Sequence, residues 1–197
     1  MLSLSVPLVL ASGSPRRRVL LATLGLTPVV RPTDADETWP SDTSPRKGVE
    51  VLARRKAALA DAAVDGHDAL VLAADTIVVL DGDILGKPKD SDHAAETLGR
   101  LSGRSHTVYT GFAMRYRDRH ASDHRATTVH FASLSASEIA RYVATGSPLD
   151  KAGAYGIQDD LGALFVESIE GDYPNVVGLP LRAVYEMLRD PFADLLV

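Results

Sequence analysis

The segment ALVLAADTIVVLDGDIL, residues 69–85, constrains the fold most, because a polar pair interrupts its apolar run and a turn signal follows. The apolar residues on either side of Asp75-Thr76 predict two halves of a buried strand, and Asp81-Gly82 predicts a hairpin turn. An ionised carboxylate between buried halves is costly unless a cation, a metal ion or several hydrogen-bond donors meet it. We therefore expect a sheet in which Asp75 has such a partner.

Apolar strand segments and amphipathic helical segments alternate along the rest of the chain. The patterns predict strands at 6–11, within 27–31, and at 106–116, 125–134 and 164–169, and helices at 15–24, 45–64, 92–101, 136–145 and 178–188. Residues 118–124 are expected to form a loop or hairpin connection, and residues 146–163 an ordered loop. The mixed order, without repeats or linkers, favours one α/β domain over residues 1–197, with a central mixed sheet flanked by helices.

Composition excludes several classes of function. The 197 residues are 45% hydrophobic, enough for a sizeable core, and the net charge of −5 argues against a nucleic-acid partner held on a broad basic face. The absence of cysteine excludes disulfides, thiolate metal sites and a cysteine nucleophile. No stretch approaches a membrane span, and no basic region precedes the apolar amino terminus, so we expect a cytoplasmic protein without a membrane partner.

The segment LASGSPRRR, residues 10–18, joins a strand to a helix that begins with three arginines. Ser14 as N-cap and Pro15 as first residue predict the helix start, and Gly25 predicts its end after about Leu24. The arginines are either an ordinary solvated face or part of an anion site at the helix N-terminus. The small Ser-Gly-Ser elbow lets phosphate oxygens approach backbone N–H groups, which favours the anion site.

The expected helix at 45–64 carries a lysine on its apolar face. Lys56 follows Leu52 by four residues and precedes Leu59 by three, whereas Arg54 and Arg55 fall outside that stripe. A lysine in this position either extends its stem along the apolar surface to reach water or meets a buried partner. The helix pattern alone favours the first alternative.

Common catalytic motifs are absent. GDILGKP has three residues between its glycines where a phosphate-binding P-loop has four, and Pro88 replaces the hydroxyl residue. His120 and His124 are expected to be surface residues or to make ordinary polar contacts. The remaining cations and carboxylates match the needs of a nucleoside triphosphate and a magnesium ion: Arg16, Arg17, Lys56, Lys87, Glu37 and Asp75.

Six segments occur in the order found in a known family: LASGSPRRRVLLATLG, LARRKA, VLAADTIVVLDGDILGKPKD, LSGRSHTVYTG, DKAGAYGIQ and GDYPNVVGLPL. Through them the chain resembles the Maf (septum formation) nucleoside triphosphate pyrophosphatases. The resemblance implies an elongated α/β enzyme with two lobes around a cleft, similar in fold to inosine triphosphate pyrophosphatases, and a homodimer. It also implies hydrolysis of a nucleoside triphosphate between the α and β phosphates, to a monophosphate and pyrophosphate, with Mg²⁺ or Mn²⁺.

The resemblance implies roles for individual residues. It assigns phosphate binding to four of them: Ser12, Arg16, Arg17 and Lys56. It assigns catalysis to Asp75 and Lys87, and the metal ion to Glu37 and Asp75. Arg18 has no role in the resemblance and is expected to face solvent.

Substrate choice depends on a different set of residues. DKAGAYGIQ resembles the branch acting on dTTP and UTP, and Arg16, Thr76 and Gln158 match the positions that distinguish the branches. The chain departs from the family at Asp159-Asp160, where glycine commonly follows the glutamine, and the added charge weakens the substrate prediction. The alternatives are a pyrophosphatase for 7-methyl-GTP or another noncanonical nucleotide, and a nucleotide-sensing regulator of septum formation. The intact catalytic carboxylates and lysine favour an enzyme over a sensor.

Overall fold

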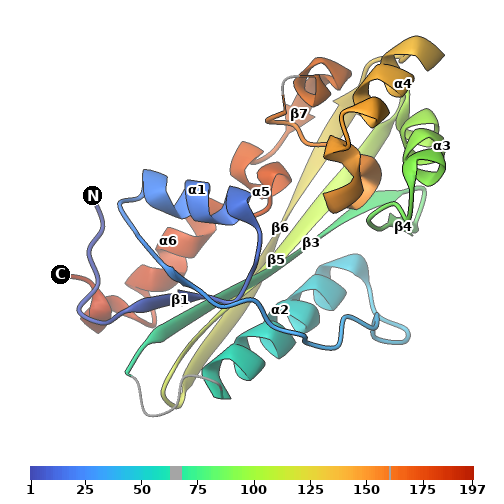
Figure 1. Cartoon of the computed structure of the whole chain (residues 1–197). Coiled ribbons are helices and arrows are strands. Elements are labelled where there is room, and N and C mark those ends of the chain that lie inside the picture. Colours follow the sequence, from blue (N-terminus) through green and yellow to red (C-terminus); the bar gives the residue numbers. More distant parts are fainter. Residues whose placement is uncertain (63–67, 160) are drawn as a thin grey trace. The chain divides into compact units, whose positions relative to one another are not determined.

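The computed structural model describes residues 1–62, 68–159 and 161–197 (Figure 1). The strands are β1 (Leu8–Leu10), β2 (Val29–Val30), β3 (Leu70–Leu80), β4 (Asp83–Leu85), β5 (Ser105–Tyr116), β6 (Arg119–Phe131) and β7 (Val166–Glu170). The α-helices are α1 (Pro15–Thr23), α2 (Pro45–Ala62), α3 (Ser91–Leu101), α4 (Ala136–Ala144), α5 (Tyr173–Val177) and α6 (Leu181–Arg189). Short 3-10 turns follow α4 and precede β7, and another lies near the carboxyl end: Ser147–Asp150, Ala152–Ala154, Gly162–Phe165 and Ala193–Leu195.

These strands form a mixed sheet in the order β2-β1-β3-β5-β6-β7, with β4 paired to β3. β1 is parallel to both neighbours, so that Val9 lies opposite Val29 on one side and Val71 on the other. β3 and β4 are antiparallel, as are β6 and β7. The predicted α/β class with a central mixed sheet is confirmed.

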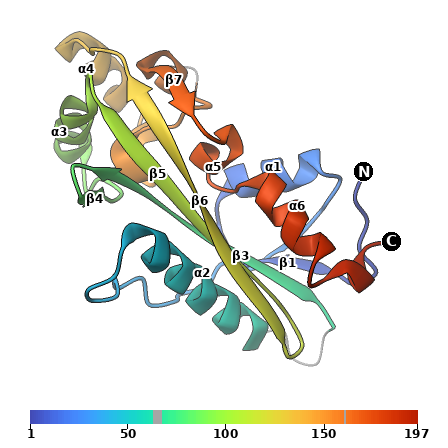
Figure 2. The same ribbon diagram turned by 180° about the vertical axis from the view of Figure 1, so that it is seen from behind.

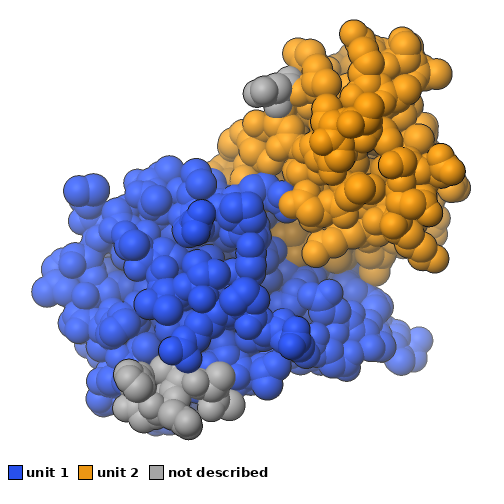
Figure 3. Space-filling view, in the orientation of Figure 1, with its two compact units in different colours: residues 1–75, 110–125, 178–197 blue, residues 76–109, 126–177 orange. Residues whose placement is uncertain are grey.

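The chain divides into two compact units (Figure 3). Unit 1 comprises Met1–Asp75, Thr110–Arg125 and Gly178–Val197, and unit 2 comprises Thr76–Tyr109 and Ala126–Val177. The long strands β3, β5 and β6 therefore contribute residues to both. Two units agree with the expected two lobes, and a single folding domain over residues 1–197 stays a prediction.

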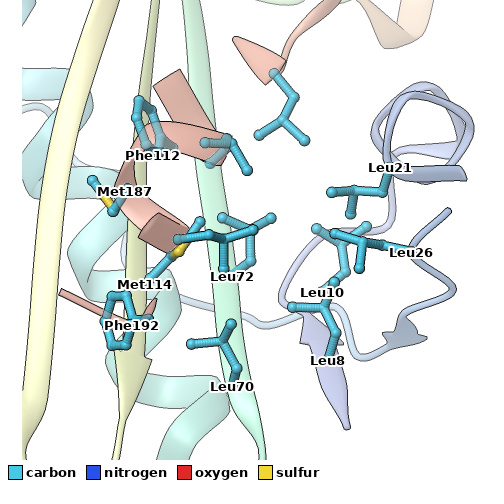
Figure 4. Close-up of a cluster of buried hydrophobic side chains, with 14 of the residues drawn as sticks. Leu8, Leu10, Leu21, Leu26, Leu70, Leu72, Phe112, Met114, Met187 and Phe192 are labelled. Atoms are coloured by element: carbon cyan, nitrogen blue, oxygen red, sulfur yellow. The ribbon is translucent and has the colours of Figure 1, made fainter. Parts of the chain in front are cut away.

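Unit 1 has apolar cores on both faces of its strands, because side chains alternate along a strand. One face packs against α1 and α6 in a cluster that Figure 4 shows, with Leu10 beside Leu21 and Leu26 and with Met187 beside Phe112. The other face packs against α2 in a cluster of small residues: Val9, Ala53, Ala57, Val71 and Ala73. Both views show α2 on the opposite side of β1 from α1 and α6 (Figures 1 and 2). By the same alternation, Asp75 lies on the α2 face of β3.

Unit 2 has its own core, built from β5, β6, α3, α4 and the loop that precedes β7. The ring of Phe131 meets Tyr155 and Phe165 edge to face, at centroid distances of 4.7 and 6.3 Å. The α4 helix begins with the predicted capping box, in which Ser135 and Glu138 exchange side-chain-to-backbone hydrogen bonds. This core positions the loop that carries Gln158.

The structure corrects three sequence expectations. Residues 118–124, expected as a loop or connection, are mostly the first part of β6, because a half-exposed strand carries polar residues without a recognisable apolar alternation. β3 continues unbroken through Asp75-Thr76, where we expected an interruption. The short α5 was not anticipated. The expected helix end at residue 64 lies outside the described residues, and among those described no helix has the length and apolar character needed to cross a bilayer.

Candidate active site

The start of α1 carries the first group of predicted residues. Ser14 is the N-cap and Pro15 opens the helix, as predicted, yet the Ser14 side chain makes no capping hydrogen bond. The buried Ser12 hydroxyl oxygen instead accepts hydrogen bonds from the Ser14 backbone N–H at 3.2 Å and from Arg17 Nη1 at 2.8 Å. Without a side-chain cap, the amide-rich end of α1 remains suited to an anion.

Arg17 is fixed at this helix start by a second bond, from Nε to the Gly178 carbonyl oxygen at 2.9 Å. Burial lowers the pKa of Arg17 from its ordinary value; the Asp75 and Glu37 carboxylates oppose the shift, and the Arg16 charge adds to it. Because a guanidinium keeps its proton in proteins, Arg17 remains a partly desolvated cation within the field of both carboxylates. Arg16 is partly buried and Arg18 is exposed, as expected for Arg18.

Lys56 lies between two carboxylates. Its Nζ is 2.6 Å from Asp75 Oδ1 and 2.6 Å from Glu37 Oε1. The Lys56 and Asp75 side chains are each 12% exposed, whereas the Glu37 side chain is 65% exposed. The lysine is therefore ion-paired at the sheet surface rather than extended along α2 toward water, and it supplies the cation that the position of Asp75 in β3 requires.

The loop that carries Glu37 is held against α2 by two neighbours of the site. Arg55 donates from Nη1 to the carbonyl oxygens of Asp36 and Thr38, at 3.2 and 2.8 Å. A Cβ built on Gly48 of α2 falls 2.1 Å from the ring of Trp39, so only glycine leaves room for the indole there. These two contacts bring the loop carboxylate within reach of Lys56.

The segment that carries Lys87 begins with the predicted hairpin. Asp81 and Gly82 have φ values of 53° and 91°, the left-handed values that a two-residue hairpin turn needs, and β4 follows. Lys87 is exposed in the loop between β4 and α3. The Gly86 carbonyl oxygen accepts a hydrogen bond from the Gly153 N–H at 3.1 Å, which ties this loop to the Gln158 loop within unit 2.

Gln158 is exposed at the end of a loop anchored by buried tyrosines. The Tyr155 hydroxyl and His106 Nε2 are hydrogen-bonded at 2.8 Å. The Tyr142 hydroxyl oxygen accepts a hydrogen bond from the Gly156 N–H at 3.0 Å. Burial raises the pKa of both tyrosines, that of Tyr142 to about 12, so both stay protonated at neutral pH. Thr76, the other predicted specificity residue in unit 2, is partly exposed and points to the face of β3 opposite Asp75.

The structure thus brings one part of the predicted site together within unit 1: Ser12, Arg16, Arg17, Glu37, Lys56 and Asp75. The other part belongs to unit 2: Thr76, Lys87 and Gln158. A common site formed by both parts stays a prediction.

A second group of possible metal ligands lies elsewhere in unit 1. Single ligand atoms of Glu50, Asp123 and His124 all lie within 4.8 Å of one another. His124 Nδ1 is 2.7 Å from Glu50 Oε1, and Asp123 Oδ2 is 2.5 Å from Arg125 Nη1. The hydrogen bond between His124 and Glu50 and the ion pair between Asp123 and Arg125 account for the cluster, which agrees with the expectation of ordinary polar contacts for His124.

A family model described as Maf-like protein matches residues 7–191. The chain belongs to this family. Among its relatives, the Maf-like chain is 54% identical to the "dTTP/UTP pyrophosphatase" of Salinibacter ruber over 100% of its own length and 96% of that protein's. It is 54% identical to the "dTTP/UTP pyrophosphatase" of Moorella thermoacetica over 92% of its own length and 93% of that protein's.

Solved structures give weaker likenesses. A Staphylococcus aureus Ham1 protein matches with a TM-score of 0.44 and 17% identity, over 64% of this Maf-like chain and 72% of that one. A nucleoside-triphosphatase, dITP/XTP pyrophosphatase, from Mycobacterium abscessus matches with a TM-score of 0.41 and 12% identity, over 95% and 94% of the two chains. The family assignment depends on the sequence matches.

Two residues of the Maf-like site were not singled out from the sequence. Arg55 falls outside the apolar stripe of its helix, and Gly178 is only the first residue of the expected helix at 178–188, yet Arg55 holds the Glu37 loop and the Gly178 carbonyl fixes Arg17. The sequence offered one signal for Arg55, its position next to Lys56 in ARRKA. Consecutive residues on a helix can contact the same neighbouring loop, here the loop that carries Glu37. No local sequence pattern indicates that the Gly178 carbonyl oxygen binds Arg17, because 161 residues separate the two.

Proposed function

We propose that the protein hydrolyses nucleoside triphosphates between the α and β phosphates, giving a monophosphate and pyrophosphate, with dTTP and UTP as its substrates. Nearly full-length relatives at about half identity are named for this activity. The observation in the structure that carries the proposal is the Glu37–Lys56–Asp75 ion-pair centre beside two arginines at an uncapped helix start. Such a centre has the charges that a triphosphate and its reaction need.

Phosphate binding is assigned to the start of α1. The uncapped N–H groups of the helix and the Arg16 and Arg17 side chains attract phosphate oxygens. Arg17 contributes a fixed orientation, because Ser12 and the Gly178 carbonyl hold two of its nitrogens at the helix start. Lys56 adds a third cation on the α2 face, and exposed Lys87 is proposed to neutralise charge on the pyrophosphate leaving group.

The residues present fit a magnesium or manganese ion. Glu37 and Asp75 supply hard carboxylate oxygens that converge on one ammonium nitrogen, and Mg²⁺ typically takes one or two protein carboxylates with phosphate oxygens and water completing its shell. We propose that these two carboxylates hold the ion. When bound, the ion neutralises phosphate charge and lowers the pKa of a coordinated water. Activity should then disappear in excess EDTA and return with added Mg²⁺, and full activity under chelation contradicts the assignment.

Asp75 is proposed to be the base that accepts a proton from the attacking water. Lys56 Nζ lies 2.6 Å from its Oδ1, which fixes the orientation of the carboxylate. The second oxygen of Asp75 is then the one available to a water molecule. Lys56 acts in this scheme by orienting the base as well as by attracting phosphate.

Base selection is assigned to Gln158, with Arg16 and Thr76. A glutamine amide presents a donor and an acceptor side by side, which matches the N3–H and adjacent carbonyl of uracil and thymine. A site that hydrogen-bonds a base edge rejects bases that leave its groups unpaired.

A substrate panel tests the proposal. Pyrophosphate release is measured for dTTP, UTP, CTP, ATP, GTP and 7-methyl-GTP, with the Asp75→Asn protein as the blank for contaminating phosphatases. We expect dTTP and UTP to give the highest kcat/KM. A preference for 7-methyl-GTP overturns the substrate assignment, and binding without release of pyrophosphate from any nucleotide overturns the enzymatic one.

Assembly and location complete the proposal. We propose a cytoplasmic homodimer that binds neither nucleic acid nor membranes, in keeping with the net charge of −5. Light scattering coupled to gel filtration measures the assembly directly, and a monomer across micromolar concentrations contradicts the dimer.

A further inference from the structure

The Asp159 side chain, which follows Gln158 in unit 2, divides its two oxygens between different partners. Oδ2 faces inward, where it accepts from Tyr142 Oη at 2.9 Å and Ser147 Oγ at 2.6 Å and lies 3.2 Å from Lys151 Nζ. Oδ1 accepts a hydrogen bond from Gln158 Nε2 at 2.7 Å. The carboxylate therefore connects a buried network to the exposed amide that is proposed to read the base.

The inward partners hold the carboxylate in place. Tyr142 is 1% exposed and Lys151 is 8% exposed, so both are set by the core of unit 2. Backbone bonds fix the residue independently of its side chain, from the Asp159 N–H to the Gly156 carbonyl at 3.0 Å and from the Ala163 N–H to the Asp159 carbonyl at 2.8 Å. A change of side chain at this position is thus expected to leave the loop backbone intact.

The carboxylate is ionised at neutral pH. Burial pushes the pKa of Asp159 upward, but the hydrogen bonds from Ser147 and Tyr142 and the Lys151 charge outweigh that effect and hold the pKa below its ordinary value. An ionised carboxylate accepts hydrogen bonds and donates none. Only the NH₂ end of the Gln158 amide can therefore face Asp159, and the amide oxygen is directed away from it.

The direction of an amide decides which pyrimidine it fits. With its oxygen against ring position 3 and its remaining N–H against position 4, the amide pairs with the N3–H donor and O4 acceptor of uracil or thymine. Cytosine presents the reverse pattern at these positions, an N3 acceptor and an N4 amino donor, so it meets like groups at both. A flipped amide would reverse the preference.

We propose that Asp159 is a positioning residue, which selects uracil and thymine over cytosine by fixing which end of the Gln158 amide faces the base. The inference rests on the proposed function and adds to it a named determinant of pyrimidine choice. Asp159 acts through Gln158 and is not assigned a contact with the substrate.

The ratio of kcat/KM for UTP to that for CTP tests the inference. Asp159→Asn keeps the shape of the side chain but allows its own amide to donate to Gln158 Oε1, which permits the flipped orientation. Because the amide orientation then no longer depends on a hydrogen bond to a charged group, we expect the ratio to fall about tenfold or more. Ser147→Ala is the matched control, because it removes a bond to Oδ2 and leaves the Oδ1 bond to Gln158 unchanged.

Each outcome decides between the inference and simpler explanations. A lower ratio in Asp159→Asn with the wild-type ratio in Ser147→Ala supports it, and equal ratios in wild type and Asp159→Asn overturn it. An equal fall of the ratio in both variants also overturns it, because a general loosening of the loop would then explain the result. If Asp159→Asn does not fold, Asp159→Ser, whose hydroxyl donates and accepts, replaces it with the same expectation. A wild-type protein that cleaves neither nucleotide refutes the proposed function itself.

Discussion

At the residue scale, Lys56 and its two carboxylates hold the charges on which the proposed chemistry depends. Asp75→Asn keeps the shape of the side chain but removes the proposed base and one negative charge. Loss of a general base typically lowers turnover roughly 10²–10⁴-fold, whereas nucleotide binding should persist because the arginines at α1 remain. Pyrophosphate release and calorimetric binding, measured together, check both parts. Turnover within about threefold of wild type would identify Asp75 as structural, since that is well below a tenfold change.

The three consecutive arginines provide a matched comparison. Arg17 is bonded to Ser12 and Gly178 and Arg16 is partly buried, whereas Arg18 is exposed. Loss of one charge-assisted phosphate contact costs about 1.5–3 kcal/mol, or roughly ten- to a hundredfold in kcat/KM. We expect that loss in Arg16→Ala and in Arg17→Ala, with cooperative melting retained, and none in Arg18→Ala. Equal activity in all three variants would show that the three arginines form an ordinary solvated helix face.

How far the site could be predicted depended on whether a residue's partner was local. The helix start at Ser14-Pro15 was correct because it depends on adjacent residues, although the Ser14 side chain makes no capping hydrogen bond. Lys56 remained ambiguous on its helix, because its partners come from β3 and from the 31–44 loop. The assignment of Lys56 to the site therefore came from the family resemblance, and its ion pairs came from the structure.

At the element scale, the site depends on how closely α2 approaches the sheet. A Cβ built on Gly111 of β5 lies 2.3 Å from the carbonyl carbon of Val49, so any side chain there forces the helix outward. Overpacking typically costs about 1–3 kcal/mol, and the displacement moves Lys56 away from Asp75. We expect Gly111→Ala to lower both the melting temperature and the activity.

The control for this change is another glycine. Gly99 lies in α3 with no atom within 4 Å of a built Cβ, so Gly99→Ala should raise stability by about 0.5–1 kcal/mol through helix propensity alone. Thermal denaturation of both variants provides the comparison. If Gly111→Ala is as stable as wild type, the close packing of α2 is not a constraint on the fold.

Elements were predictable where they carry an apolar pattern or a specific turn. The Asp81-Gly82 hairpin and the Ser135 capping box were correct for this reason. The first part of β6 is half-exposed and rich in charge, so its strand pairing leaves no apolar alternation to recognise. The five-residue α5 is too short to show a helical period.

At the scale of the whole molecule, stability should depend on the protonation of a buried histidine. His106 is 3% exposed, its Nδ1 has no hydrogen-bond partner among the described residues, and burial lowers its pKa from 6.5 to about 4, with a smaller effect of His130. Between these values the unfolded chain binds a proton that the folded protein does not. The free energy of unfolding should therefore fall as the pH drops from 6.5 to 4, by up to about 1.4 kcal/mol per pH unit from this group.

Urea denaturation across this pH range measures the effect. Other groups contribute to the wild-type slope, including Asp159, so the comparison is with His106→Gln, which lacks the titrating ring. We expect the wild-type slope to exceed that of the variant below pH 6.5 and the two slopes to agree above it. Parallel slopes throughout would show that His106 has the same pKa in the folded and unfolded states.

The position of bond cleavage tests the central claim most directly. Phosphorus NMR follows wild-type protein with UTP and Mg²⁺, and identifies each product by its own resonance. We predict that UMP and pyrophosphate appear in equal amounts, with no accumulation of UDP, because the site is proposed to direct water to the bond between the α and β phosphates. The appearance of UDP and orthophosphate in their place would contradict the account.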